Sequence, residues 1–261
     1  MKQTWKKFLL FTFLLTYICH GILAVLNAQG IIQLRSFPGQ VLYILGGSSP
    51  TILAFIVAHV LYNDEDKKTF YRNLLNFKQP IIYYAFALLM PIVLGMIFIL
   101  VSFLTGKPAF SQVSSPIQFF IFFFPAIIFG GLEEVGWRGI LQERLSNKIM
   151  PLPLAIIIGL IWGAWHLPMF LIPDLGNTPA GYLPFVLQGI VLSMFITYLY
   201  AKTASIPLTV FCHAAINAAG SMGLLMPFEN RLDVYLYLAI GLAVGTILLG
   251  KLKQTSQGKP E

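Results

Sequence analysis

The chain has 261 residues, of which 57% are hydrophobic and only 10% are charged, and its mean hydropathy is +0.78. Soluble globular domains lie far outside this range, so we expect a protein that crosses the membrane several times. The formal net charge of +7 comes from basic residues scattered over short loops, and this scatter indicates membrane topology more than a nucleic-acid surface. The two cysteines, Cys19 and Cys212, lie in separate apolar segments, which favours free core residues over a disulfide or a cysteine metal site.

The amino terminus places three lysines before an apolar run over residues 8–28, a pattern that resembles a signal peptide. The run is too long for a signal-peptide core, and Leu26 occupies the position two before Ala28 where a small residue would mark cleavage. We therefore predict a first membrane span that stays in the protein.

Eight apolar windows of about 20 residues predict an all-α, polytopic membrane protein. The windows cover residues 8–28, 41–62, 81–104, 117–132, 152–172, 182–201, 206–225 and 234–250. The fourth window reaches full length only if it continues through Glu133 and Arg138, which places both inside the membrane. Pro125 and the pair Gly130 and Gly131 should bend this span or let a neighbouring helix approach closely.

The basic residues divide unevenly between the two sides of these spans. Of the 17 lysines and arginines, all but Arg35, Lys107 and Arg231 fall on the side of the amino terminus. Cytoplasmic loops carry the excess of Lys and Arg, so both termini are predicted to be cytoplasmic. The division is 14 to 3, or 13 to 3 when Arg138 is counted as intramembrane.

The connections between spans differ in character. The segment NDEDKKTFYRNLLNF, residues 63–77, mixes charge with aromatic and apolar residues, so it is either a short helix on the membrane surface or a solvated loop. Residues 172–184 are rich in Pro and Gly and should be irregular. The polar segment from Lys251 onward is expected to be disordered.

The stretch GGLEEVGWRGILQERL, residues 130–145, places charges at the end of the run FFIFFFPAIIF. An ionisable group costs about 2.5 to 3.5 kcal/mol at the centre of a membrane helix, so such groups usually mark a functional site. In a helix, Arg138 lies about 40° around from Glu134 and about 140° from Glu133, which pairs it with Glu134 and leaves Glu133 free. The alternative is a solvated acidic turn in the headgroup region. Glu143 and Arg144 are expected to form a solvated pair at the mouth of this helix.

Two further spans carry polar pairs at a spacing of four residues. Trp162 is followed by His166 in IWGAWHLPMF, and His213 is followed by Asn217 in FCHAAINAAG. Each pair therefore lies on one helix face and needs polar partners inside the bundle. Each histidine could simply be an interhelical hydrogen-bonding residue.

Four other polar residues in or near spans have no second polar residue one turn away, and we interpret them as structural. They are His20, Asn27, His59 and Gln188.

Glu133, His166 and His213 together suit the activation of a water molecule for hydrolysis. A glutamate can take the proton, while histidine and asparagine donors stabilise the oxyanion that forms. The same three side chains could instead bind zinc, because two histidines and a carboxylate form a common catalytic zinc set. The residue pattern leaves both chemistries open, although the helical zinc motif HExxH is absent.

Taken in order, three motifs resemble those of the CPBP family of CAAX-prenyl-protease and bacteriocin-processing intramembrane proteases. They are Glu133-Glu134-x3-Arg138-Gly139, the WHLP segment at His166, and His213-x3-Asn217 after SIPLTV. The resemblance covers roughly residues 116–225, so we divide the chain into amino-terminal spans (1–115), CPBP-like catalytic helices (116–225), and a last span with a polar tail (226–261).

The resemblance implies an eight-helix intramembrane endopeptidase. Its catalytic residues would be Glu133, which activates water with His166, and the transition-state donors His213 and Asn217. The residues implied to support them are Glu134, Arg138 and Trp162. Trp162 stands where the family often has Phe.

The resemblance leaves the substrate and the cofactor open. Relatives include processors of prenylated proteins, peptide maturation enzymes and bacteriocin immunity proteins, so the expected partners are the bilayer and a membrane-anchored protein or peptide, in a bacterial-type cytoplasmic membrane. The family is often described as metalloproteases, and a zinc ion would take Glu133, His166 and His213. We favour water activation without a metal, in a cavity that opens toward the cytoplasmic side. The rival functions are an ion- or proton-coupled transporter, whose expected inverted repeat is missing, and a non-catalytic immunity or scaffold protein.

Overall fold

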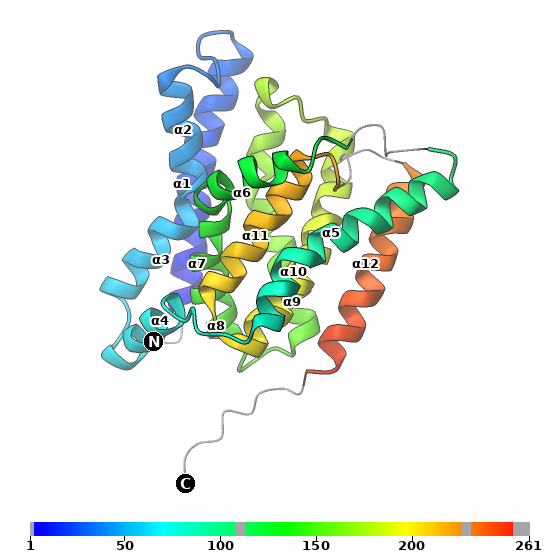
Figure 1. The fold of residues 1–261 in the computed structure, drawn as a ribbon. Coiled ribbons are helices and arrows are strands. Elements are labelled where there is room, and N and C mark those ends of the chain that lie inside the picture. The colour runs from blue at the N-terminus through cyan, green and yellow to red at the C-terminus, as the bar shows by residue number, and fades with distance from the viewer. Residues whose placement is uncertain (1–2, 108–112, 226–230, 253–261) are drawn as a thin grey trace.

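The computed structural model describes residues 3–107, 113–225 and 231–252 (Figure 1). Within these ranges the regular structure is entirely helical, and the predicted all-α membrane class is confirmed. Lys2 and most of the predicted disordered tail lie outside the described residues.

Ten helices of 11 residues or more make up the described bundle. They are α1 (Thr4–Ala28), α2 (Phe37–Gly47), α3 (Ser49–Val60), α4 (Asp64–Leu74), α5 (Ile81–Leu104), α6 (Ile117–Ile128), α9 (Pro151–Trp165), α10 (Tyr182–Thr203), α11 (Ile206–Ser221) and α12 (Leu232–Gly250). Short turns of helix, including α7 (Glu134–Gly136) and α8 (Glu143–Leu145), connect α6 to α9.

The predicted number of eight spans is approximate. Six helical segments in the described ranges are long and apolar enough to cross a membrane, and α2 with α3 makes a seventh span that is bent by 51°. The remaining predicted span, residues 206–225, corresponds to α11, which has only 16 residues.

Both ends of the described chain lie at the same end of the bundle. The start of α1 and the end of α12 are found there together with α4 and the α10–α11 connection (Figure 1). We call this the terminal end. The α1–α2 and α9–α10 connections lie at the other end, called the distal end below (Figure 1).

The break between α2 and α3 has a local cause. Pro50 has no N–H to donate to the carbonyl of Gly46, four residues earlier. The hydroxyl of Thr16 in α1 donates to that carbonyl instead, across 2.8 Å. Thr16 also contacts Ser49 and accepts a 2.6 Å hydrogen bond from the indole of Trp165. This buried polar cluster ties α1, α3 and α9 together.

The fourth span continues through Glu133 and Arg138 as predicted, but it is not one straight helix. It runs from Ile117 to Leu145 and contains the break after α6, a 3₁₀ turn over Gly131–Glu133 and a π-helical segment over Trp137–Gln142. The glycines at the break allow close approach, as expected, because a Cβ on Gly131 would meet the backbone of Val210 in α11.

The last part of the fourth span, together with its neighbours, forms an apolar plug in the terminal half of the bundle. Trp137, Ile140 and Leu141 are fully buried there and pack with Leu154 of α9 and Ile206 of α11. This plug leaves the fourth span accessible from the distal half of the bundle.

The segment after α3 forms a helix, so the solvated-loop alternative is wrong. Asn63 caps α4 by accepting from the backbone N–H of Asp66. Phe70 on the inner face is buried, and Asn73 donates to the hydroxyl of Tyr200 across 3.0 Å. The helix is therefore anchored to the bundle by one face.

Glu143 and Arg144 do not form the expected pair. Arg144 forms an ion pair with Asp66 of α4 at 2.6 Å, and Glu143 accepts from the hydroxyl of Tyr200 at 2.8 Å. The amide of Asn73 in α4 donates to the same oxygen of Glu143 at 3.5 Å, so both residues contact α4 and Glu143 also contacts α10. The two cysteines are free and buried, as predicted.

Candidate active site

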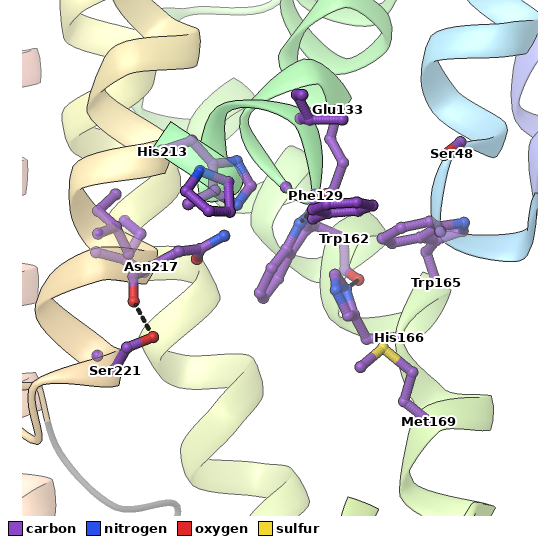
Figure 2. Close-up of a pocket in the computed structure, with 18 of the residues that line it drawn as sticks. Ser48, Phe129, Glu133, Trp162, Trp165, His166, Met169, His213, Asn217 and Ser221 are labelled. Carbon is purple, nitrogen blue, oxygen red and sulfur yellow. Dashed lines mark hydrogen bonds between the residues drawn. The ribbon is translucent and has the colours of Figure 1, made fainter. Parts of the chain in front are cut away.

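The candidate catalytic residues line one cavity of about 630 Å³. Glu133 comes from the broken fourth span, His166 from the end of α9, and His213 and Asn217 from α11 (Figure 2). Trp162, one turn before His166, lies among them (Figure 2). The structure thus brings together all four residues for which the sequence predicted a direct catalytic role.

Two indoles hold the carboxylate of Glu133. Its Oε2 accepts a hydrogen bond from Trp162 Nε1 at 3.0 Å and another from Trp137 Nε1 at 3.3 Å. The side chain is only 9% exposed. Within the described part of the chain Oε1 has no hydrogen-bond partner, so this oxygen is available to a water molecule in the cavity.

Glu134 is oriented away from Glu133 and lies between an arginine and a histidine. Its Oε2 accepts a hydrogen bond from Nε of Arg138 at 2.6 Å, and this ion pair confirms the one predicted from helical spacing. Its Oε1 lies 2.8 Å from Nδ1 of His213. A small cavity of about 50 Å³ adjoins these three side chains.

The contact with Glu134 fixes the orientation of His213. With Nδ1 donating to the carboxylate, Nε2 is the nitrogen left for the cavity. Glu134 is thus the acceptor that orients His213. Glu134 belongs to a helix turn distant in sequence, so spacing within α11 gave no sign of it.

The guanidinium of Arg138 is held on several sides. It donates to Gln142 at 3.0 Å and to the hydroxyl of Thr197 at 2.8 Å, and it is 2% exposed. Thr197 belongs to α10, so Arg138 links the broken fourth span to that helix. Arg138 does not line the large cavity, which supports a structural role.

His166 ends α9 and is oriented by its own helix. Its Nδ1 lies 2.9 Å from the carbonyl of Trp162, and the two rings lie 4.0 Å apart, centre to centre. No direct hydrogen bond joins His166 to Glu133 in the described residues. Trp162 connects them, because it donates to the glutamate and packs on the histidine. A bridging water would complete the expected partnership.

Asn217 lies on the same face of α11 as His213, as its spacing predicts, and it is partly exposed to the cavity (Figure 2). Its amide nitrogen packs so closely on Gly130 that a Cβ there would collide with it. The absence of a side chain at the helix break therefore makes room for Asn217.

Two polar residues that we interpreted from the sequence as structural, His20 and Gln188, also line this cavity. His20 Nε2 lies 3.0 Å from the carbonyl of Tyr43, whereas its Nδ1 and the Oε1 of Gln188 have no partner among the described residues. Spacing could not reveal them, because each is the single polar residue that its helix contributes here. Asn27, by contrast, binds loop backbone, and His59 is exposed outside the cavity.

The side chains of the zinc-binding alternative are not assembled as a ligand set in this structure. Within the described ranges, no three His, Cys, Asp or Glu side chains are grouped so that they could hold a metal ion. Glu133, His166 and His213 line the same cavity but are spread around it, so the mechanism below uses no step through a metal.

The cavity extends toward the distal end of the bundle, so the two sequence-based expectations, a cytoplasmic opening of the cavity and cytoplasmic termini, do not hold together. Its exposed lining residues include Ser221 at the distal end of α11, Phe122 and Phe129 of the α6 segment, and Ile44 of α2. The apolar plug around Trp137 closes the other direction.

Comparison with known proteins supports the resemblance seen in the motifs. A family model described as "Type II CAAX prenyl endopeptidase Rce1-like" matches residues 115–219, a range that contains all three motifs. The chain is also 28% identical over 233 residues to a protein of Methanococcus maripaludis named CAAX prenyl protease 2, with 81% of this chain and 82% of the relative covered. The resemblance to the CPBP family is therefore confirmed.

Proposed function

We propose that this membrane protein is an intramembrane endopeptidase that hydrolyses a peptide bond in a membrane-associated protein or peptide. The observation that carries the proposal is the buried carboxylate of Glu133, which is held by two indoles and faces a 630 Å³ cavity shared with two histidines and an asparagine. A cavity of this size can admit a peptide segment.

In the proposed mechanism a water molecule lies between Oε1 of Glu133 and Nε2 of His166. Glu133 takes one proton of the water while the oxygen of that water forms a bond to the peptide carbonyl carbon. The indoles of Trp162 and Trp137 keep Oε2 engaged, so the proton goes to Oε1. Oε2 of Glu133 is therefore the oxygen that the indoles hold, and Oε1 is the oxygen that accepts the proton.

The carbonyl oxygen gains negative charge in the tetrahedral intermediate. The amide N–H groups of Asn217 and the Nε2–H of doubly protonated His213, oriented by Glu134, act as donors to it. The intermediate then collapses, the C–N bond breaks, and Glu133 returns its proton to the departing amine. The products are a carboxylic acid and an amine, with one water consumed.

The substrate class and the membrane in which the protein lies are also part of the proposal. The name of the archaeal relative favours CAAX-type processing, while bacteriocin maturation or immunity is the other outcome of the family resemblance. The family resemblance supports a bacterial-type cytoplasmic membrane, and the distribution of the basic residues supports cytoplasmic termini.

The test is cleavage by the purified protein in detergent. A degenerate library of lipid-anchored peptides should yield new amino termini with wild type and none with Glu133→Gln, while thermal stability stays near wild type. The matched control is Glu65→Gln, which makes the same change on the exposed face of α4 and should cleave normally. Equal cleavage by wild type and Glu133→Gln would remove Glu133 from the mechanism. No cleavage by wild type at all would count against a protease.

A further inference from the structure

We propose that the cavity takes its substrate from the non-cytoplasmic face of the membrane, so that the substrate is an outward-exposed segment of a membrane-anchored protein or peptide. This inference rests on the proposed function. It adds the side of the membrane on which cleavage occurs, which neither the motifs nor the comparisons specify.

The first observation is the position of the cavity along the bundle. Glu133 lies 12 residues from the terminal end of its span at Leu145, and His166 lies 15 residues from Pro151. At about 1.5 Å per residue these positions correspond to about 18 and 22 Å, past the middle of a hydrocarbon layer of about 30 Å when counted from the terminal end. The catalytic groups are therefore at similar depths.

Several of the other lining residues lie on the distal side of these groups. Gly220 and Ser221 form the distal end of α11, Met169 follows the end of α9, and Phe185 is in the first turn of α10, which begins at the distal end (Figures 1 and 2). The cavity thus extends from the depth of the catalytic groups to the distal end.

The second observation is that the terminal side is closed. Trp137, Ile140 and Leu141 have no exposed surface, and Val135 is only 1% exposed. A separate hollow at the terminal end, lined by residues of α1, α4 and α8 among others, includes none of the candidate catalytic side chains. A peptide could reach Glu133 from that side only by displacing this packed core.

The third observation is the charge at the two ends. In the described ranges, the loops and helix ends at the terminal end carry the basic residues Lys6, Lys7, Lys67, Lys68, Arg72, Lys78, Arg144, Lys148, Lys202 and Lys251. The distal end carries Arg35, Lys107 and Arg231, and Arg231 forms an ion pair with Asp233 at 2.6 Å. The rule that basic loops stay in the cytoplasm therefore makes the distal end the outer one.

The mouth of the cavity also suits a substrate that remains in the membrane. Phe129 is 64% exposed, and Phe122 and Ile44 are each 39% exposed, on segments that face outward from the bundle. Such apolar residues are compatible with lipid, whereas Ser221 at the same mouth is polar and exposed. A lipid anchor or membrane helix could lie against the apolar part while the adjoining peptide enters the cavity.

A labelling experiment tests the direction of the cavity in intact cells. Ser221→Cys places a thiol at the mouth, and Asn147→Cys places one in the exposed connection between α8 and α9 at the terminal end. The wild type is the background control, because Cys19 and Cys212 are buried. A membrane-impermeant maleimide should label Ser221→Cys in intact cells and Asn147→Cys only after lysis. Labelling of Ser221→Cys with the bulky reagent should also block peptide cleavage.

A second experiment identifies the side of cleavage for whichever substrates the cell contains. New amino termini of membrane proteins are compared between cells that produce the wild type and cells that produce Glu133→Gln. The expected termini, present only with the wild type, map to outward-exposed segments next to a membrane anchor.

The outcomes separate the two proposals. Labelling of Asn147→Cys in intact cells, or new amino termini confined to cytoplasmic segments, would overturn the inference about the side of cleavage. The proposed protease function would still stand if the purified protein cleaves peptides in detergent. Absence of cleavage both in detergent and in cells would overturn the proposed function, and the inference about its substrate with it.

Discussion

The indole N–H of Trp162 donates to Oε2 of Glu133 across 3.0 Å and thereby joins α9 to the broken fourth span at the centre of the cavity. The two residues are 29 positions apart in the sequence. The family often has phenylalanine at the position of Trp162, and a phenyl ring could pack on His166 but could not donate this bond. In this protein the carboxylate is therefore held by an additional donor.

Trp162→Phe should lower kcat by about 10- to 100-fold with a small change in thermal stability. A hydrogen bond to a charged group contributes about 1.5 to 3 kcal/mol, and its loss frees the carboxylate to rotate. The measurements are steady-state cleavage and thermal unfolding in detergent. Trp5→Phe, the same change in α1 outside the cavity, is the control. An unchanged kcat for Trp162→Phe would show that Trp137 alone orients the glutamate.

Gly130→Ala should impair cleavage because the new methyl group occupies the space of the Asn217 amide. Either the amide turns out of the cavity or the helix break shifts, and both reduce the stabilisation of the oxyanion. We expect a loss of at least tenfold in kcat, the usual cost of removing one such donor being about 100- to 1000-fold. Gly21→Ala in α1 is the control, because its Cβ would meet nothing within 4 Å. Full activity of Gly130→Ala would contradict a role for Asn217.

Arg138→Ala should destabilise the protein as well as inactivate it. Removal of one partner of a buried ion pair leaves an uncompensated charge on Glu134, at a cost of about 3 to 5 kcal/mol. Thermal unfolding of Arg138→Ala, Glu134→Gln and the double variant forms a mutant cycle, in which the second change should recover part of the stability lost with the first. An Arg138→Ala protein that is inactive yet fully stable would reassign Arg138 to substrate binding.

Chelation of metals should leave the cleavage rate unchanged. Glu133, His166 and His213 form no group that could hold an ion in the described structure, and the Nδ1 atoms of both histidines are engaged by protein oxygens. The measurement is peptide cleavage after dialysis against a strong zinc chelator. If activity is lost on chelation and restored by zinc, the metal-free mechanism is wrong and the same residues act with a zinc ion.

The sequence by itself determined the features that depend on one helix at a time. Apolar composition located the spans, because about 20 apolar residues are needed to cross a bilayer. The spacing of four residues predicted the contact between Glu134 and Arg138 and the shared face of His213 and Asn217, because 3.6 residues per turn bring such positions together. The three motifs predicted which side chains meet in the cavity.

Only the tertiary structure decided how separate helices meet. Glu134 orients His213, and Trp162 holds Glu133, because of the rotation and depth at which each helix packs, which no local spacing records. The same packing brings His20 and Gln188 to the cavity wall. It also closes the terminal side with Trp137 and its neighbours, and so directs the cavity to the distal end. Because protein interiors are closely packed, the contacts between residues distant in sequence depend on how all the helices pack together.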